Sequence, residues 1–261
     1  MESETLLAHS LQTDRLNLYL YPDRPLTDEE LDKFRPMIKE RRKGIPIQYI
    51  TGKVNFMGLE LKVDKRALIP RPETEEMVEQ ILTEHKKIGG LKILDLGTGC
   101  GAIAIALAKY LIKPKITACD ISGEALELAR ENASQNKVGS SIDFIKSDWF
   151  EKLEGKFDII ATNPPYVDCD ELEELDPKIK DHEPDLALNG GEEGIKEIER
   201  ILKDTDDHLK SDGCIYMEIG ADQGNLVKKI ARKQGSFNFV ETIKKKKKKD
   251  RILTAGKKRE V

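Results

Sequence analysis

The chain has 261 residues and a formal net charge of -4 at pH 7, with 38% hydrophobic and 35% charged residues. This length gives room for one large domain, or for one domain with a small appendage. The longest apolar stretch, around AIAIALA, is far shorter than the ~18 residues of a membrane span, which excludes a transmembrane segment. The first residues, MESETLLAHS, fit neither a secretory signal nor a transit peptide, and we expect a cytoplasmic protein.

The spacing of cysteines and histidines argues against metal chemistry. Neither the four cysteines nor the four histidines form a C-x-x-C pair, an HExxH motif or a similar ligand set. We therefore expect no metal and no disulfide framework. The cysteines that we expect to be reduced are Cys100, Cys119, Cys169 and Cys214.

Charge is distributed unevenly along the chain. Residues 228–261 contain 14 Lys and Arg against 3 Asp and Glu, a net of +11, which leaves -15 for residues 1–227. The basic part includes a lysine run, Lys244 to Lys249. Such a run fits a weak contact with nucleic acid or an acidic partner, but a solvated hairpin tip is the preferred interpretation.

Three regions follow one another along the chain. Residues 1–50 show helical periodicity, and Thr27 with Glu30 predicts a capping box at a helix start. The segment IQYITGKVNFMGLELKV is rich in β-branched and aromatic residues and predicts a hairpin linker, which we place at residues 51–66. In residues 67–261, apolar runs such as KILDL, KITACD, IDFIK, FDIIATN and GCIYMEI alternate with helical stretches. This alternation predicts an α/β fold with a doubly wound, mostly parallel sheet.

The stretch KILDLGTGCGAIAIALAKYL places a glycine-rich turn between a strand and a helix. Ligands of open α/β sheets bind just beyond the carboxyl ends of such strands, and the N–H groups at a helix start favour an anion. The spacing G-x-G-x-G matches neither a P-loop nor the G-x-G-x-x-G of dinucleotide binders. The candidate ligand-binding residues of this turn are Gly97, Thr98, Gly99, Cys100 and Gly101.

Two further candidate sites follow the next strands. Asp120 lies 23 positions after Gly97, where a carboxylate accepts both hydroxyls of an adenosine ribose. The alternative role for Asp120 is a cap on the helix that begins near Ser122. After the strand IDFIK, Asp148 and Trp149 are placed to meet the amino group and the ring of an adenine, although a lone tryptophan more often belongs to a core.

The stretch ATNPPYVDCD, residues 161–170, ends an apolar strand with a stiff loop. Two consecutive prolines donate no ladder hydrogen bonds, and each fixes φ near about −65°. Asn163 precedes them and is pushed toward extended geometry. The loop therefore presents one amide and one aromatic ring, on Asn163 and Tyr166.

Taken in order, the glycine turn, the acid, the DW pair and NPPY resemble the class I S-adenosylmethionine-dependent methyltransferases. The resemblance implies a seven-stranded Rossmann-like sheet, with S-adenosylmethionine as cofactor and S-adenosylhomocysteine as product. NPPY resembles the members that methylate a planar, conjugated nitrogen, which is a poor nucleophile. Acceptors on Asn163 and on the Pro164 carbonyl would hold that nitrogen near the methyl group, with Tyr166 against the flat group and Asn163 also at the cofactor.

Longer stretches narrow the resemblance to one family. The segments RRKGIPIQYITGKVNFMGLELKVDKRALIPRPETEEMVE, HEPDLALNGGEEGIKEIERIL and YMEIGADQG are similar to the release-factor glutamine methyltransferases. That family modifies the glutamine of the Gly-Gly-Gln motif in class I peptide-chain release factors. The resemblance implies these factors as partners, with a shortened docking domain in residues 1–50. The residues that would face the glutamine are Asn163, Pro164, Pro165 and Tyr166.

Two other segments bear on this resemblance. IPRPETE would line the cleft mouth, with Arg71 and Glu73 as substrate contacts. The alternative is a plain helix start, with Pro72 in the first turn and acids near the helix dipole. The lysine run replaces an acid and a glycine of the family pattern, so we expect an irregular last hairpin.

Two other functions stay open. NPPY alone does not separate an amide from an adenine, so the first is a nucleic-acid adenine N6-methyltransferase. The acidic segment DCDELEELD, directly after NPPYV, opposes the phosphate contacts that such an enzyme needs. The second is a non-catalytic cofactor-binding module, which an intact NPPY argues against.

Overall fold

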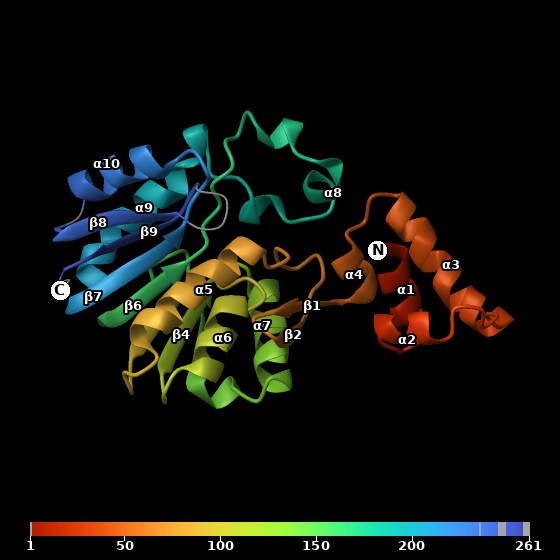
Figure 1. Ribbon diagram of the computed structural model, residues 1–261. Coiled ribbons are helices and arrows are strands. Elements are labelled where there is room, and N and C mark those ends of the chain that lie inside the picture. Colours follow the sequence, from red (N-terminus) through yellow and green to blue (C-terminus); the bar gives the residue numbers. More distant parts are fainter. Residues whose placement is uncertain (1, 235, 245–248, 258–261) are drawn as a thin grey trace.

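The computed structural model describes residues 2–234, 236–244 and 249–257. Most of them surround one large sheet, and helices from the first fifty residues form a lobe beside it (Figure 1). The sheet has seven strands in the order β5-β4-β3-β6-β7-β9-β8. Its strands are β3 (Lys92–Leu96), β4 (Lys115–Asp120), β5 (Ile142–Lys146), β6 (Phe157–Thr162), β7 (Leu209–Glu218), β8 (Phe239–Lys244) and β9 (Asp250–Gly256).

Pairing within the sheet is mostly parallel. The strands from β5 to β7 pair in parallel, whereas β9 is antiparallel to both β7 and β8. The chain moves outward from β3 to β5 and then returns to β6 on the other side of β3. The predicted doubly wound, mostly parallel seven-stranded sheet is therefore confirmed.

Helices cover both faces of this sheet (Figure 1). One core cluster joins residues of three helices to the strands, and a second joins residues of two other helices to the opposite face. Successive strand residues supply both clusters, since Ile93 faces the first and Leu94 the second. The first set is α5 (Pro72–His85), α6 (Ala102–Tyr110) and α7 (Gly123–Gln135); the second is α9 (Lys196–His208) and α10 (Gly224–Gln234).

The N-terminal lobe contains four helices followed by a hairpin. The predicted capping box is present, because Thr27 and Glu30 exchange side-chain to backbone hydrogen bonds at the start of the third helix. The elements are α1 (Glu2–Ser10), α2 (Arg15–Leu20), α3 (Asp28–Arg42), α4 (Ile47–Thr51), β1 (Lys53–Phe56) and β2 (Leu59–Lys62). The antiparallel pairing of β1 with β2 confirms the hairpin.

The segment Ile47–Thr51 is helical, although its β-branched residues predicted part of the hairpin. Pro46 stands at the N-cap, and Gly52 ends the helix in a left-handed conformation with φ 70°. These two boundary residues outweigh the strand preference of the five residues between them. The proposed domain limits at residues 50 and 66 stay predictions.

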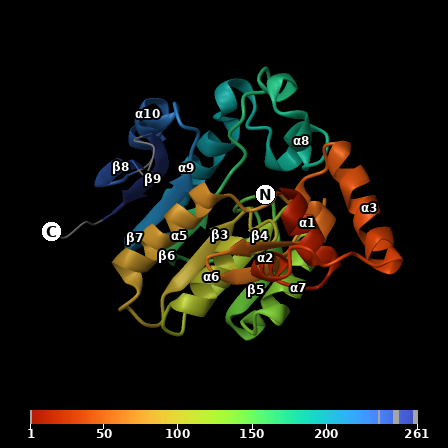
Figure 2. The same ribbon diagram turned by 45° about the vertical axis from the view of Figure 1, so that its right-hand side comes forward.

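A long segment with only short helical turns leaves the sheet after β6 and extends toward the N-terminal lobe (Figure 1 and Figure 2). It carries α8 (Pro177–Lys180), and a Cβ built on Gly44 of the lobe would lie 3.5 Å from His182 Nε2 of this segment. The 3₁₀ turns among the described residues are Gly139–Ser141, Leu172–Glu174, Asp185–Ala187 and Glu192–Gly194.

The last hairpin is irregular, as expected, because the register of β8 on β9 shifts between Ile243 and Lys244. Lys244 ends β8, and Lys249 forms an exposed ion pair with Asp222 at 3.5 Å. The rest of the lysine run, residues 245–248, lies outside the described residues. Among the described helices, we find none with the length and hydropathy needed to cross a bilayer.

Candidate active site

A cavity of about 330 Å³ lies at the carboxyl ends of the central strands. The residues that follow β3, β4, β5 and β6 line it, together with the segments 65–70 and 184–189. β3 and β6 are neighbours whose connections run to opposite sides of the sheet, and this is where open α/β sheets bind their ligands. The topology therefore brings together all four sites predicted from the sequence.

The glycine turn forms one wall of this cavity. Gly97 has φ 69°, and a Cβ added there would lie only 3.2 Å from Trp149 Cζ3. Thr98 Oγ1 donates to Asp95 Oδ2 at 2.6 Å, and Ala104 N donates to the same oxygen at 3.0 Å. Asp95 is fully buried, which raises its carboxyl pKa to about 7. This aspartate below the turn belongs to the strand motif KILDL, where the sequence analysis assigned it no role.

Asp120 lies on the cavity wall and is bound to the glycine turn. Its Oδ2 accepts from Gly99 N at 2.8 Å, and its Oδ1 accepts from Ser122 N at 2.9 Å. Burial raises the pKa of this carboxyl. Helix α7 is capped by Ser122, whose Oγ accepts from Ala125 N. Ser122 therefore fills the helix-capping role considered for Asp120, while the ribose role stays a prediction.

Asp148 and Trp149 also line the cavity, and α9 holds both of them. Trp149 Nε1 donates to Glu197 Oε2 at 2.6 Å. Arg200 donates to Asp148 Oδ2 at 2.9 Å and to Glu197 Oε2 at 2.8 Å. Trp149 has φ 44°, a conformation that few residues other than glycine adopt. The predicted adenine side thus depends on Glu197 and Arg200 of α9, two residues for which the sequence gave no signal.

Only two of the four NPPY residues line the cavity. Asn163 and Pro165 line the cavity, whereas Pro164 and Tyr166 are not among its lining residues. The Tyr166 hydroxyl instead donates to Glu218 Oε1 at 3.2 Å behind the loop. The structure therefore brings Asn163 to the cofactor side and gives the Tyr166 hydroxyl an internal partner, while a substrate contact by the Tyr166 ring or by Pro164 stays a prediction.

The segment LNGGEEG, residues 188–194, and Gln223 pack against the backbone of the NPPY loop and the residue that follows it. Gln223 Nε2 donates to the Tyr166 carbonyl at 3.1 Å, and Gly190 N donates to the Val167 carbonyl at 2.8 Å. A Cβ on Gly190 would lie 2.8 Å from Tyr166 Cα, and one on Gly194 would overlap the Tyr166 carbonyl oxygen. Glycine is thus required where two backbones touch.

Thr74 and Glu218 connect the NPPY loop to the rest of the domain. Asn163 Nδ2 donates to Thr74 Oγ1 at 3.1 Å, and Thr74 Oγ1 donates to Glu218 Oε2 at 2.7 Å. Glu218 is fully buried at the end of β7, and burial raises the pKa of its carboxyl to about 7. Both residues stand in the quoted motifs RPETE and YMEIG, but the sequence analysis gave neither a role.

Arg71 and Glu73 do not line the cavity, although Pro70 and Thr74 beside them do. Helix α5 begins at Pro72, with Arg71 as its N-cap residue and acids in its first turn. This is the plain helix start considered for RPETE. Arg71 Nη2 also donates to Glu183 Oε1 at 2.6 Å, and Glu183 is 5% exposed. A substrate contact by Arg71 or Glu73 stays a prediction.

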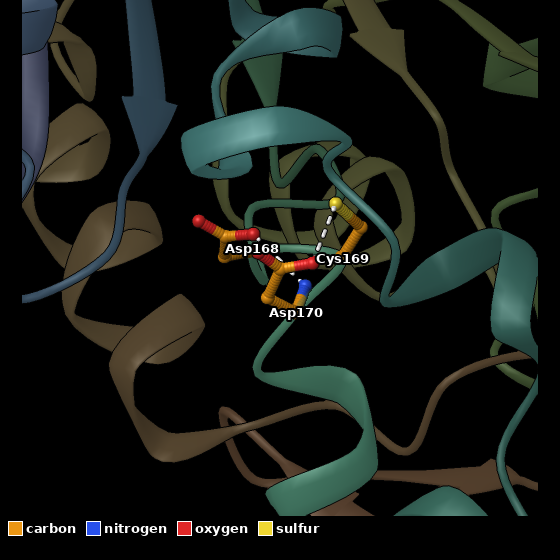
Figure 3. A group of neighbouring side chains, drawn as sticks. All are labelled: Asp168, Cys169 and Asp170. Atoms are coloured by element: carbon orange, nitrogen blue, oxygen red, sulfur yellow. Dashed lines mark hydrogen bonds between the residues drawn. The ribbon is translucent and has the colours of Figure 1, made fainter.

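One group of side chains in the described ranges has the donor types of a metal site (Figure 3). Asp168, Cys169 and Asp170 are consecutive residues just after NPPY. Figure 3 shows that the group is bonded internally: Cys169 Sγ donates to Asp170 Oδ1, and Asp170 N donates to Asp168 Oδ1. Such bonds are typical of an acidic turn, and we assign no ion to it.

Comparisons with known proteins agree with this geometry. A family model described as "Methyltransferase small domain" matches residues 74–176, and one described as "PrmC N-terminal domain" matches residues 1–52. Among solved structures, a methyltransferase from Pyrococcus furiosus has a TM-score of 0.58 and 22% identity, covering 85% of this chain and 97% of that one. The hMettl16 catalytic domain has a TM-score of 0.64 and 17% identity, covering 78% and 77%. These structures show the class I methyltransferase fold.

Curated relatives carry the comparison further. The release factor glutamine methyltransferase of Lactococcus lactis is 46% identical over 82% of this chain and 78% of that protein. The protein of the same name from Agrobacterium fabrum is 37% identical over 97% of this chain and 89% of that protein. The resemblance seen in the sequence is thereby confirmed. The chain belongs to the release factor glutamine methyltransferase family, and it is an S-adenosylmethionine-dependent protein-glutamine methyltransferase.

Proposed function

We propose that this enzyme methylates the side-chain nitrogen (N5) of the glutamine in the Gly-Gly-Gln motif of class I peptide-chain release factors. The observation that carries the proposal is the orientation of Asn163 at the cavity wall. Because Thr74 engages Nδ2, Oδ1 is the atom of this amide that remains to accept a hydrogen bond. An acceptor is what a substrate amide, which brings two N–H donors, requires.

The residues that line the cavity fit S-adenosylmethionine. The turn at Gly97 has little room for a Cβ, which would lie 3.2 Å from Trp149 Cζ3, so its backbone forms a cradle against Trp149. Asp120 would bind the ribose, while Asp148 and Trp149 would meet the adenine; the other turn residues in contact would be Thr98, Gly99, Cys100 and Gly101. When bound, the cofactor supplies an electrophilic methyl group on its sulfonium sulfur, and S-adenosylhomocysteine is the product.

The protein's own contribution is to hold a weak nucleophile in line. An amide nitrogen reacts poorly because its lone pair is delocalised into the carbonyl. Oδ1 of Asn163 and the Pro164 carbonyl would accept its two N–H hydrogens, which orients the lone pair toward the methyl group. Methyl transfer would form a nitrogen–carbon bond as the carbon–sulfur bond breaks, and the nitrogen would then lose one proton to solvent. No strong base is needed before transfer.

Release factors act in translation, so this substrate supports a cytoplasmic location. Residues 1–50 would dock the factor, and neither a membrane nor a nucleic acid is needed. The competing substrate is an adenine base, which would bind the same Asn163 through its exocyclic amine. A basic contact through Lys244 to Lys249 would serve that alternative, while the acidic residues that follow NPPY oppose it.

The test is methyl transfer from labelled S-adenosylmethionine to either a release factor or unmodified DNA and RNA. We expect label on the Gly-Gly-Gln glutamine, located by mass spectrometry of the digested factor. A release factor with Gly-Gly-Ala in place of Gly-Gly-Gln is the matched control and should stay unlabelled. Label in nucleic acid, or equal labelling of the control factor, would contradict the proposal.

A further inference from the structure

A buried chain of hydrogen bonds lies directly behind the Asn163 amide. It joins the first turn of α5 to the end of β7 through Thr74 Oγ1, which lies 3.1 Å from Asn163 Nδ2 and 2.7 Å from Glu218 Oε2. The other oxygen of Glu218 accepts from the Tyr166 hydroxyl at 3.2 Å. Glu218 therefore holds both ends of the NPPY loop, one directly and one through Thr74.

The order of donors along this chain decides which way the Asn163 amide faces. Thr74 has a single O–H hydrogen, and an ionised Glu218 can only accept it. With its hydrogen given to Glu218, the Thr74 oxygen can only accept from Asn163. The amide must then direct its NH₂ group to Thr74, which leaves its carbonyl oxygen for the substrate.

Protonation of Glu218 would remove this restriction. A neutral Glu218 can donate to Thr74, and the Thr74 hydrogen would then be able to bond to Oδ1 of Asn163 instead. The amide could turn over and present its NH₂ group to a substrate nitrogen that also carries hydrogens. Two donors facing each other form no hydrogen bond, so the substrate would lose its anchor.

We propose that Glu218 is a positioning residue: when ionised, it sets the orientation of the Asn163 amide through Thr74 and fixes the NPPY loop through Tyr166. The inference rests on the proposed function, because it assumes that Oδ1 of Asn163 accepts from the methylated nitrogen. It goes beyond that function by placing the control of the site on a buried carboxylate outside the cavity lining.

The surroundings of Glu218 set the pH range of this control. Burial disfavours ionisation most strongly, and the nearby Glu73 of α5 adds to it. The hydrogen bonds from Thr74 and Tyr166 and the charge of Arg251 on β9 favour ionisation. Burial also raises the pKa of the Tyr166 hydroxyl, so Tyr166 stays a donor. With a carboxyl pKa of about 7, the positioned form should grow by about tenfold between pH 6 and pH 8.

The first experiment measures single-turnover methylation of a release factor at saturating cofactor between pH 6 and pH 8.5. Burial also raises the pKa of Asp95, beneath the cofactor turn, to about 7. Because the cofactor is saturating, a change in cofactor affinity caused by Asp95 does not alter the measured rate. We expect the wild-type rate to rise about tenfold over this range. Glu218→Gln should abolish the rise, because it no longer titrates. A wild-type rate independent of pH, or a rise that persists in Glu218→Gln, would overturn the proposal.

Thr74 offers a matched pair of variants. Thr74→Val keeps the shape and removes the hydroxyl, so it should lower the rate about 100-fold, as for other lost groups that orient a reacting atom. Thr74→Ser keeps the hydroxyl and should stay within about threefold of wild type, with the same pH profile. Equal rates for the two variants would show that the hydroxyl has only a structural role.

A second readout needs no methylation. The side-chain NH₂ signals of Asn163 in ¹⁵N-labelled protein, assigned by their loss in Asn163→Asp, should shift between pH 6 and pH 8 in wild type. At pH 8, the signals of Thr74→Val should differ from those of wild type, whereas the signals of Thr74→Ser should match them. Unchanged signals in Thr74→Val would overturn the positioning role, even with an active enzyme. If release factors proved not to be substrates, these signals would still decide the positioning role separately.

Discussion

The two ends of the cavity are held together in different ways. At the cofactor end, the bond from Gly99 N to Asp120 joins residues 21 positions apart, and the whole turn lies within one strand–turn–helix unit. At the acceptor end, Asn163 meets Thr74 across 89 positions, and Thr74 meets Glu218 across 144. The glycine turn of the cofactor end is therefore a local motif, whereas the acceptor end exists only once three distant elements have packed.

The sharpest test of the acceptor end is Asn163→Ala. It should lower single-turnover methylation by about 10²–10³, because it removes both the orientation of the substrate nitrogen and an acceptor dipole. Pro164 and Pro165 still stiffen the loop, so the melting temperature and cofactor affinity should change little. Asn163→Asp, which keeps the shape, serves as control. A folded Asn163→Ala enzyme with a rate within a few-fold of wild type would remove Asn163 from the reaction.

The cofactor end should respond in affinity instead. Asp120→Ala removes the carboxylate proposed to bind the ribose, and should weaken S-adenosylmethionine binding by roughly 1.5–3 kcal/mol, the range for hydrogen bonds to a charged group. Isothermal calorimetry measures this directly. Affinity equal to wild type would leave Asp120 with only its bonds to Gly99 and Ser122.

Gly97→Ala should weaken cofactor binding by about tenfold, because the new Cβ pushes against the Trp149 ring at 3.2 Å. Gly155→Ala is the matched control: Gly155 has φ 87° and nothing within 4 Å of an added Cβ. Both variants carry similar backbone strain, so only the clash separates them. Equal loss of affinity in the two proteins would show that strain, and not the cradle, is responsible.

The smallest effect is expected from the lysine run. Neutral replacement of Lys244 to Lys249 should leave turnover on a small glutamine peptide within about threefold, because exposed charges act on encounter and are screened beyond ~10 Å. Turnover on a full release factor, measured in parallel, reports any effect on docking. A collapse on the peptide would mean that this segment belongs to the active structure.

The same contrast explains how much the sequence alone could predict. The alternation of apolar runs and helices predicted the sheet, and the glycine turn was found because its residues are contiguous. Thr74 and Glu218 gave no such signal, since an isolated threonine or a glutamate at a strand end is common. Glu183 was missed for the same reason, because its partner Arg71 lies 112 positions away.

Local strand preference also misled at one place. Ile47, Ile50 and Thr51 are β-branched, yet the segment is helical between Pro46 and Gly52. The Trp149 ring was predicted at the cavity, but nothing in the sequence indicated that Glu197 would hold it. The boundaries of this helix lie in the adjacent residues Pro46 and Gly52, whereas the partner of Trp149 lies 48 positions away, outside the pattern of a single segment.

The glycines that support Tyr166 have a consequence for any survey of mutational tolerance. Gly194 has φ 65°, and a Cβ there would overlap the Tyr166 carbonyl oxygen. Every one of its substitutions should therefore be harmful, although Gly194 is not among the residues that line the cavity. In a map of tolerated substitutions, this position would look as restricted as Asn163. Substrate analogues would separate the two, because a residue that acts only through backbone packing should impair all acceptors equally.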